Sequence, residues 1–167
     1  MALVSTSQVV LDQSATPVTK VNALEKGGVV RVATGYLAAA SFVGGTAGQW
    51  YTFVRIPVRA QVVDIKMVGA TTTSGAVKCG LYRPDGIAID DDVFATLYDM
   101  AAEKDGASLL VTPTAEQRTQ TIATAYATAI GTAGATGDAE VDIALTIVTA
   151  LGAGVNHAMI VEYTLPE

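Results

Sequence analysis

Hydrophobic and polar residues alternate with a period of two along most of the chain after residue 28, which predicts β-strands. The run 141–148 is the clearest case, because a large aliphatic residue returns at every second position. We predict that Val141, Ile143, Leu145 and Ile147 face a core and that Asp142, Ala144 and Thr146 face outward. The predicted strands span residues 29–33, 50–57, 61–68, 76–82, 87–90, 141–148 and 156–165.

The same alternation assigns faces within the other strands. In 61–68 the core face carries Val63, Ile65 and Met67, opposite Asp64 and Lys66. In 76–82 the core face carries Val77, Cys79 and Leu81, opposite Lys78 and Tyr82. In 156–165 one side carries His157, Met159, Val161, Tyr163 and Leu165.

Two turn signals predict hairpins. Arg83-Pro84-Asp85-Gly86 combines a proline that presets φ with a glycine that tolerates positive φ, so 76–90 reads as a hairpin. The glycine-rich stretch 151–154 separates the last two strands, and we expect 141–148 and 156–165 to pair with each other.

Two segments fit more than one structure. Residues 91–97 form either the end of a strand or one helical turn. Residues 114–130 alternate as a strand does, but Ile122, Tyr126 and Ile130 also share a helix face. Thr114 with Gln117 makes a capping box, and Gly131 stands where a helix C-cap belongs, so a short helix is favoured. The stretch 132–137 reads as a loop.

Residues 1–28 differ from the rest, because their apolar residues are scattered among Ser, Thr and Gln and the segment ends in Gly27-Gly28. We interpret them as an extended N-terminal arm that reaches a neighbouring subunit; a plain first strand is the alternative. Residues 29–167 then form a single domain. Short strands with glycine-rich turns predict an all-β fold, a jelly-roll-like antiparallel β-sandwich.

Composition argues against a catalytic or metal centre. The 167 residues include one Cys and one His, too few for an internal disulfide or a structural zinc site. Cys79 and His157 both fall within alternating apolar runs, where a buried structural role is usual. The familiar nucleophile, phosphate-loop and metalloprotease motifs are absent from the sequence. We therefore expect no enzyme activity and no cofactor.

The charge is acidic overall and unevenly distributed. A net charge of −6 argues against nucleic acid as a partner. Residues 1–83 carry +5 and residues 84–167 carry −11, a polarity that suits docking between unlike faces unless folding mixes the two halves. The sequence has no stretch of about 20 apolar residues that could span a membrane, and its first residues do not read as a signal peptide, so we expect a soluble protein made in a cytoplasm.

A few side chains are candidates for contact with a partner. Trp50 and Tyr51 begin an aromatic strand and suit either an interface or the core. Arg55 and Arg59 could meet an acidic surface or be solvated. The run Asp90-Asp91-Asp92 suggests a calcium site, but it lacks EF-hand spacing, and a solvated strand end is the alternative.

Several segments taken in order resemble the jelly-roll decoration, or cement, proteins on the heads of tailed bacteriophages. The segments are WYTFVRIPVRAQVVDIKMVGA, VKCGLYRPDGIAIDDDVFA and EVDIALTIVTALGAGVNHAMIVEYTLP, and the likeness covers roughly residues 50–97 and 138–165. The resemblance implies a non-enzymatic virion structural protein on the exterior of the phage head. It would bind the major capsid protein, bridge neighbouring subunits and form a homo-oligomer, either a trimer or a dimer.

The alternative function is a ligand-binding β-sandwich module, for example one for carbohydrate, in a head-fibre or tail-associated protein. Such a module should be a monomer with exposed aromatic residues in a groove. An assembly protein should instead carry an ordered arm that crosses to another chain.

Overall fold

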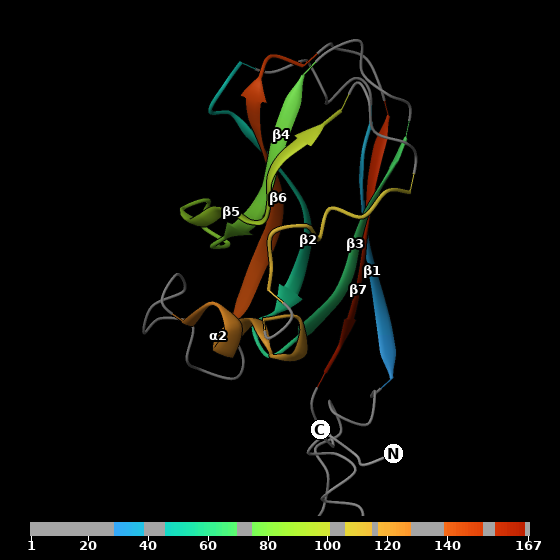
Figure 1. Cartoon of the computed structure of the whole chain (residues 1–167), viewed down its shortest axis with the longest axis vertical. Helices are drawn as coiled ribbons and strands as arrows, with labels where there is room; N and C mark the ends of the chain where they lie inside the picture. Colours follow the sequence, from blue (N-terminus) through green and yellow to red (C-terminus); the bar gives the residue numbers. More distant parts are fainter. Residues whose placement is uncertain are drawn as a thin grey trace, which may run out of the picture.

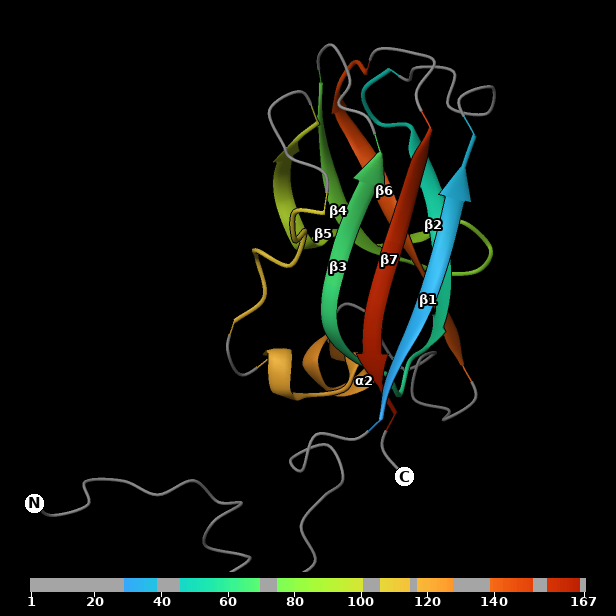
Figure 2. The same cartoon turned by 90° about the vertical axis from the view of Figure 1, so that its right-hand side faces the viewer.

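Seven strands form two antiparallel sheets that face each other, as the computed structural model of the chain shows (Figures 1 and 2). The structure describes residues 29–38, 46–69, 75–100, 106–114, 117–127, 139–151 and 156–165. The arm 1–28 and the loop 132–137 lie outside these residues. The three-stranded sheet has the order β1 (Val30–Leu37), β7 (His157–Thr164) and β3 (Gln61–Gly69). The four-stranded sheet has the order β2 (Trp50–Pro57), β6 (Glu140–Thr149), β4 (Ala76–Tyr82) and β5 (Ala88–Asp99).

This strand order confirms the predicted jelly-roll-like sandwich. The chain passes from sheet to sheet between β1, β2, β3 and β4, and again between β6 and β7. A jelly roll has eight strands. The place of the eighth is taken here by residues 106–112, which we call the crossover segment. It continues the three-stranded sheet beyond β3 through a single antiparallel bridge between Lys66 and Ser108.

The predicted hairpin between the last two strands is wrong. β6 lies between β2 and β4 in one sheet, whereas β7 lies between β1 and β3 in the other. Both strands carry a continuous apolar face, and these two faces meet across the core instead of lying side by side in one sheet. The chain therefore crosses between sheets after Leu151, whose side chain is buried.

The centre of the four-stranded sheet is buried on both faces. Val141, Ile143, Leu145 and Ile147 face the core as predicted and are at most 2% exposed. The prediction that the alternate residues face solvent is wrong. Asp142, Ala144 and Thr146 are also buried. Neighbouring strands and the hairpin of β4 and β5, which folds over the sheet, cover this second face, as described below.

A β-bulge explains the one misassigned face of β3. The register against β7 shifts between Val62 and Asp64, so one extra residue is inserted in β3. Val62 is buried in place of Val63, which is 44% exposed. Ile65 and Met67 lie in the core, as predicted.

The two ambiguous segments are resolved. Residues 91–97 belong to β5, a strand of 12 residues, and the turn before it has Gly86 at φ 88°. The predicted helix begins with the expected capping box, in which Thr114 and Gln117 exchange backbone and side-chain hydrogen bonds. It is broken, however, into a 3-10 turn, η1 (Gln117–Thr119), and one α-helical turn, α2 (Ile122–Ala125), because Thr121 caps a second start. Residues 128–131 lie outside the described part.

The core is one hydrophobic cluster between the sheets. Its largest fully buried side chains come from the six strands β2 to β7, the turn after β2, α2 and the crossover segment. In the part of the chain that the structure describes, none of the helices has the length and apolar character of a membrane span. The largest are Phe94, Ile56, Ile65, Leu81, Leu109, Ile122, Ile143, Leu145, Ile147, Met159 and Val58.

Candidate interaction surfaces

The crossover segment closes one side of the sandwich. Its backbone donates to β3 through Gly106 N and Leu109 N, and to β5 through Val111 N and Thr112 N, which both reach the carbonyl of Phe94. Ser108 Oγ donates to the carboxylate of Asp64. The outer edges of β3 and β5 therefore have backbone partners along part of their length.

The opposite side is formed by the edge strands β1 and β2, which touch without a backbone ladder. Each pairs within its own sheet, β1 with β7 and β2 with β6, and no backbone hydrogen bond joins the two strands in the described residues. They approach closely at Gly35, where a Cβ atom would lie 1.9 Å from the carbonyl oxygen of Phe53. β1 and β2 therefore contact each other on this side without forming a backbone ladder, and β1 is the outer strand of the three-stranded sheet (Figure 2).

Exposed large apolar side chains concentrate on β1 and the residue before it. Val29, Val30, Val32 and Tyr36 are 83%, 51%, 60% and 67% exposed. The even-numbered residues of β1 point to the outer face of the sheet, because the odd positions Ala33, Gly35 and Leu37 are partly or fully buried. The sequence analysis missed this surface. The predicted strand ended at residue 33. Gly35 interrupts the apolar pattern, so the uncharged outward positions of the longer strand were not recognised.

The same outer face also carries three charged side chains on β3 and β7, which pair with one another. Lys66 Nζ lies 2.9 Å from Glu162 Oε1 and 3.2 Å from Asp64 Oδ2. Burial tends to raise the pKa of Asp64, but the hydrogen bonds from Ser108 and Lys66 outweigh it and lower the pKa. The outer face of the three-stranded sheet thus carries one group of paired charges on β3 and β7, next to the apolar Ile160 of β7, and is uncharged along β1.

Arg55 and Arg59, the predicted basic contacts, differ in what they do. Arg55 on β2 makes a two-pronged ion pair with Asp142 on β6, with Nε 2.6 Å from Oδ1 and Nη2 3.0 Å from Oδ2. Its hydrogen bond to Asp142 raises the pKa of Arg55. The Asp142 side chain is only 6% exposed, so Arg55 compensates a nearly buried carboxylate. Arg59, in the turn before β3, is exposed.

Trp50 and Tyr51, the predicted aromatic contacts, lie at the start of β2. Trp50 is 41% exposed and stacks on Tyr82 of β4, with ring centroids 5.0 Å apart. Gly86 of the following turn packs against its ring. Tyr51 is partly buried against the core. Trp50 therefore has one face engaged within the fold and part of its surface open to a partner.

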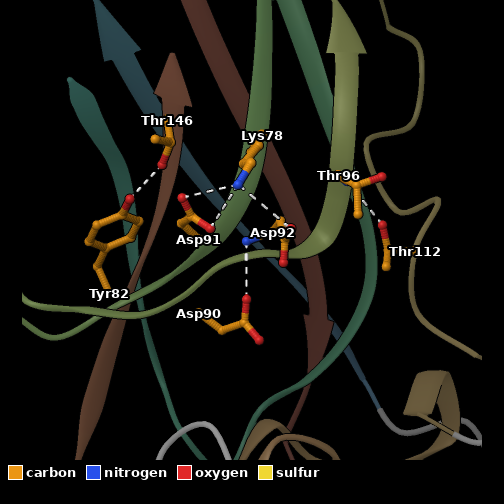
Figure 3. Close-up of polar contacts among 8 residues, drawn as sticks. All are labelled: Lys78, Tyr82, Asp90, Asp91, Asp92, Thr96, Thr112 and Thr146. Carbon is orange, nitrogen blue, oxygen red and sulfur yellow. Dashed lines mark hydrogen bonds and ion pairs between the residues drawn. The ribbon is translucent and has the colours of Figure 1, made fainter. Parts of the chain in front are cut away.

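The Asp90-Asp91-Asp92 run lies where β5 folds over the outer face of the four-stranded sheet (Figure 3). A Cβ on Gly80 would lie 2.3 Å from the backbone of both Asp90 and Asp91, so only glycine permits this crossing. The three carboxylates lie within 4.8 Å of one another. Lys78 is their counter-ion, 3.3 Å from Asp91 and 3.7 Å from Asp92.

The hairpin of β4 and β5 also buries polar groups. Tyr82 and Thr146 share a short hydroxyl hydrogen bond beneath it. Burial raises the pKa of Asp90; the hydrogen bond that its carboxylate accepts from the Asp92 backbone N–H lowers the pKa, and the Asp92 carboxylate raises it. The acidic run is thus partly neutralised by Lys78, and its three carboxylates are half-buried.

A cavity of about 490 Å³ opens beside this run. Asp90, Asp92, Thr112 and Tyr126 are among its lining residues. Burial raises the pKa of Tyr126 to about 12, so its phenol stays protonated near neutral pH. Its ring packs edge-on against Phe94, with centroids 5.7 Å apart.

Cys79 and His157 lie on different sheets, on β4 and β7. Cys79 is fully buried, and burial raises the pKa of its thiol far above the usual value. His157 is 2% exposed, and burial lowers its pKa. These environments stabilise the neutral forms of both side chains, which does not favour a thiolate–imidazolium pair.

Comparison with solved structures finds chains that align over most of this chain despite little sequence similarity. A chain of the capsid of Ralstonia phage GP4 aligns with a TM-score of 0.51 and 13% identity, over 83% of this chain and 85% of that chain. A chain of the cyanophage Pam1 capsid asymmetric unit gives 0.49 and 15%, over 82% and 85%. A chain of the acid-stable capsid of Helicobacter pylori bacteriophage KHP30 gives 0.46 and 16%, over 84% and 90%. No protein-family model and no curated protein sequence matches the chain.

Proposed function

We propose that this protein is a structural component of a phage virion, a decoration protein that binds the exterior of the head and stabilises contacts between major capsid subunits. The observation that carries the proposal is the shared fold: a chain in the GP4 capsid superposes on most of this chain. The segments that resemble the decoration proteins lie mainly on β2, β3, β4, β5, β6 and β7.

The surface of the sandwich is consistent with a protein that acts by binding other protein subunits. An edge strand carries exposed Val32 and Tyr36, and large exposed apolar patches on small domains mark sites of association. Contacts that exist only in the assembled shell stabilise the shell by mass action. In this proposal the chain is a homo-oligomer without enzyme activity or cofactor, and it is made in the host cytoplasm.

Binding to purified heads tests the proposal. Heads assembled from the major capsid protein encoded in the same genome are mixed with the purified protein and sedimented. We expect saturable co-sedimentation and a higher melting temperature of the heads. Absence of binding at micromolar concentration would contradict the proposal. Binding to oligosaccharides by a monomeric protein would support the carbohydrate-binding alternative, for which Trp50 is the most suitable aromatic residue.

A further inference from the structure

We propose that the edge of β1 is a self-association surface, at which β1 of two copies pair antiparallel around a two-fold axis near Thr34. The two three-stranded sheets would then join into one of six strands. The inference gives the homo-oligomer of the proposed function a specific interface. It rests on the exposed edge, and it holds or fails without reference to capsids.

The open backbone edge is the first observation. β1 is eight residues long and contains no Pro and no Lys, two residues that commonly protect sheet edges from pairing. The crossover segment pairs with the opposite edge of the same sheet, but in the described residues no segment pairs with the outer edge of β1. An edge of this kind is a template for another strand.

The side chains on the outer face are the second observation. Val30, Val32, Thr34 and Tyr36 point outward, and none of the four is charged. A two-fold axis at Thr34 places Tyr36 opposite Val32 of the second copy and Thr34 opposite its own counterpart. Aromatic–β-branched and Thr–Thr pairs are among the favourable cross-strand pairs.

Self-complementarity favours a second copy over an unrelated partner. A two-fold interface brings the same patch together from both sides, so its own sequence must pair well with itself. Arg31 is the one charged residue of β1. In this register Arg31 lies opposite Leu37 of the second copy, and the two arginines are about 20 Å apart at the strand rise of about 3.4 Å per residue. The pairing therefore brings no like charges together.

Sedimentation of matched variants tests the surface. We expect the wild-type chain to be a dimer at about 50 μM without capsids, because burying this edge is favourable for two copies. Val32→Asp should convert it to a monomer. Val111→Asp, at an equally exposed position in the crossover segment (61% against 60%), should leave it a dimer. A monomeric wild type, or a dimer that responds equally to both variants, would overturn the proposal.

A cysteine at the axis tests the register. Opposed Cβ atoms in an antiparallel pair lie about 4.5–5.5 Å apart, near the range that a disulfide spans. Thr34→Cys should therefore cross-link two copies under mild oxidation, whereas Thr52→Cys on β2 should not. The native Cys79 is buried and does not interfere.

Deletion of residues 1–26 separates the edge from the arm. The dimer should persist in the shortened protein and still dissociate with Val32→Asp. Loss of the dimer on deletion alone would assign self-association to the arm and overturn the proposal. Failure of capsid binding with an intact dimer would count against the proposed function only.

Discussion

At the scale of single residues, ion pairs join the basic first half of the chain to the acidic second half. Arg55 pairs with Asp142, Lys66 with Glu162, and Lys78 with Asp91. Each pair links neighbouring strands, because the jelly roll places strands from both halves side by side in each sheet. The uneven charge along the sequence therefore serves partly within the fold, and the two halves do not form two separate faces.

Arg55 and Arg59 should consequently respond differently to charge reversal. Arg55→Glu would place a second carboxylate beside nearly buried Asp142, so we expect a clear fall in melting temperature. Arg59→Glu, at an exposed turn, should leave the melting temperature nearly unchanged. Thermal unfolding followed by circular dichroism measures both. An unchanged melting temperature for Arg55→Glu would mean that the ion pair contributes nothing to stability.

The single histidine should make stability depend on pH near neutrality. Burial lowers the pKa of His157 below its usual 6.5, so the unfolded chain binds the proton more tightly than the folded one. The contribution is full above pH 6.5 and is lost as the pH falls from there toward the lower folded pKa. Urea unfolding between about pH 7.5 and 5.5 should show a decline that His157→Gln reduces. An equal decline in that variant would assign the effect to other groups.

At the scale of the elements, β6 is one of the two inner strands of its sheet, and both of its faces are buried. We expect Ile143→Ala to reduce the free energy of unfolding by about 2–5 kcal/mol, the usual cost of truncating a fully buried aliphatic side chain. Leu97→Ala, at a 61% exposed position on β5, should cost less than about 0.5 kcal/mol. Denaturant titration measures both, and similar values would contradict the assigned face.

Alternation predicted individual strands well and their partners poorly. The bounds of β2 and β4 match the prediction. Val63 was misassigned because a bulge shifts the period by one residue, and a bulge leaves no local signal in a run of β-branched residues. The pairing of β6 was missed because alternation specifies which face is apolar and not which strand lies alongside.

For the candidate contact residues, too, the sequence identified the residues but not their partners. Composition identified Arg55, Trp50 and the acidic run, but the structure shows internal partners for all three: Asp142, Tyr82 and Lys78. The apolar outer positions of β1 could have been found by extending the strand through Gly35. Whether those positions face solvent or a second sheet depends on the strand order, which pattern alone does not determine.

At the scale of the whole molecule, the domain and the N-terminal arm should be separable. In the described residues, strands β1 to β7 share one hydrophobic core. We expect deletion of residues 1–26 to leave the melting temperature nearly unchanged and to weaken binding to phage heads. Calorimetry and co-sedimentation measure the two effects. A domain that fails to fold after the deletion would show that the arm is an integral part of the sandwich.

Salt should distinguish the two associations proposed for the molecule. Pairing along β1 buries uncharged side chains, so dimerisation should change little between about 0.05 and 0.5 M salt. Binding to heads should weaken over the same range if Arg59 and other exposed bases contribute, because the screening length falls from about 10 Å at 0.1 M to about 3 Å at 1 M. Arg59→Glu should then reduce head binding and its salt dependence, with the dimer intact. Head binding that is indifferent to both salt and Arg59→Glu would leave apolar burial as its main source.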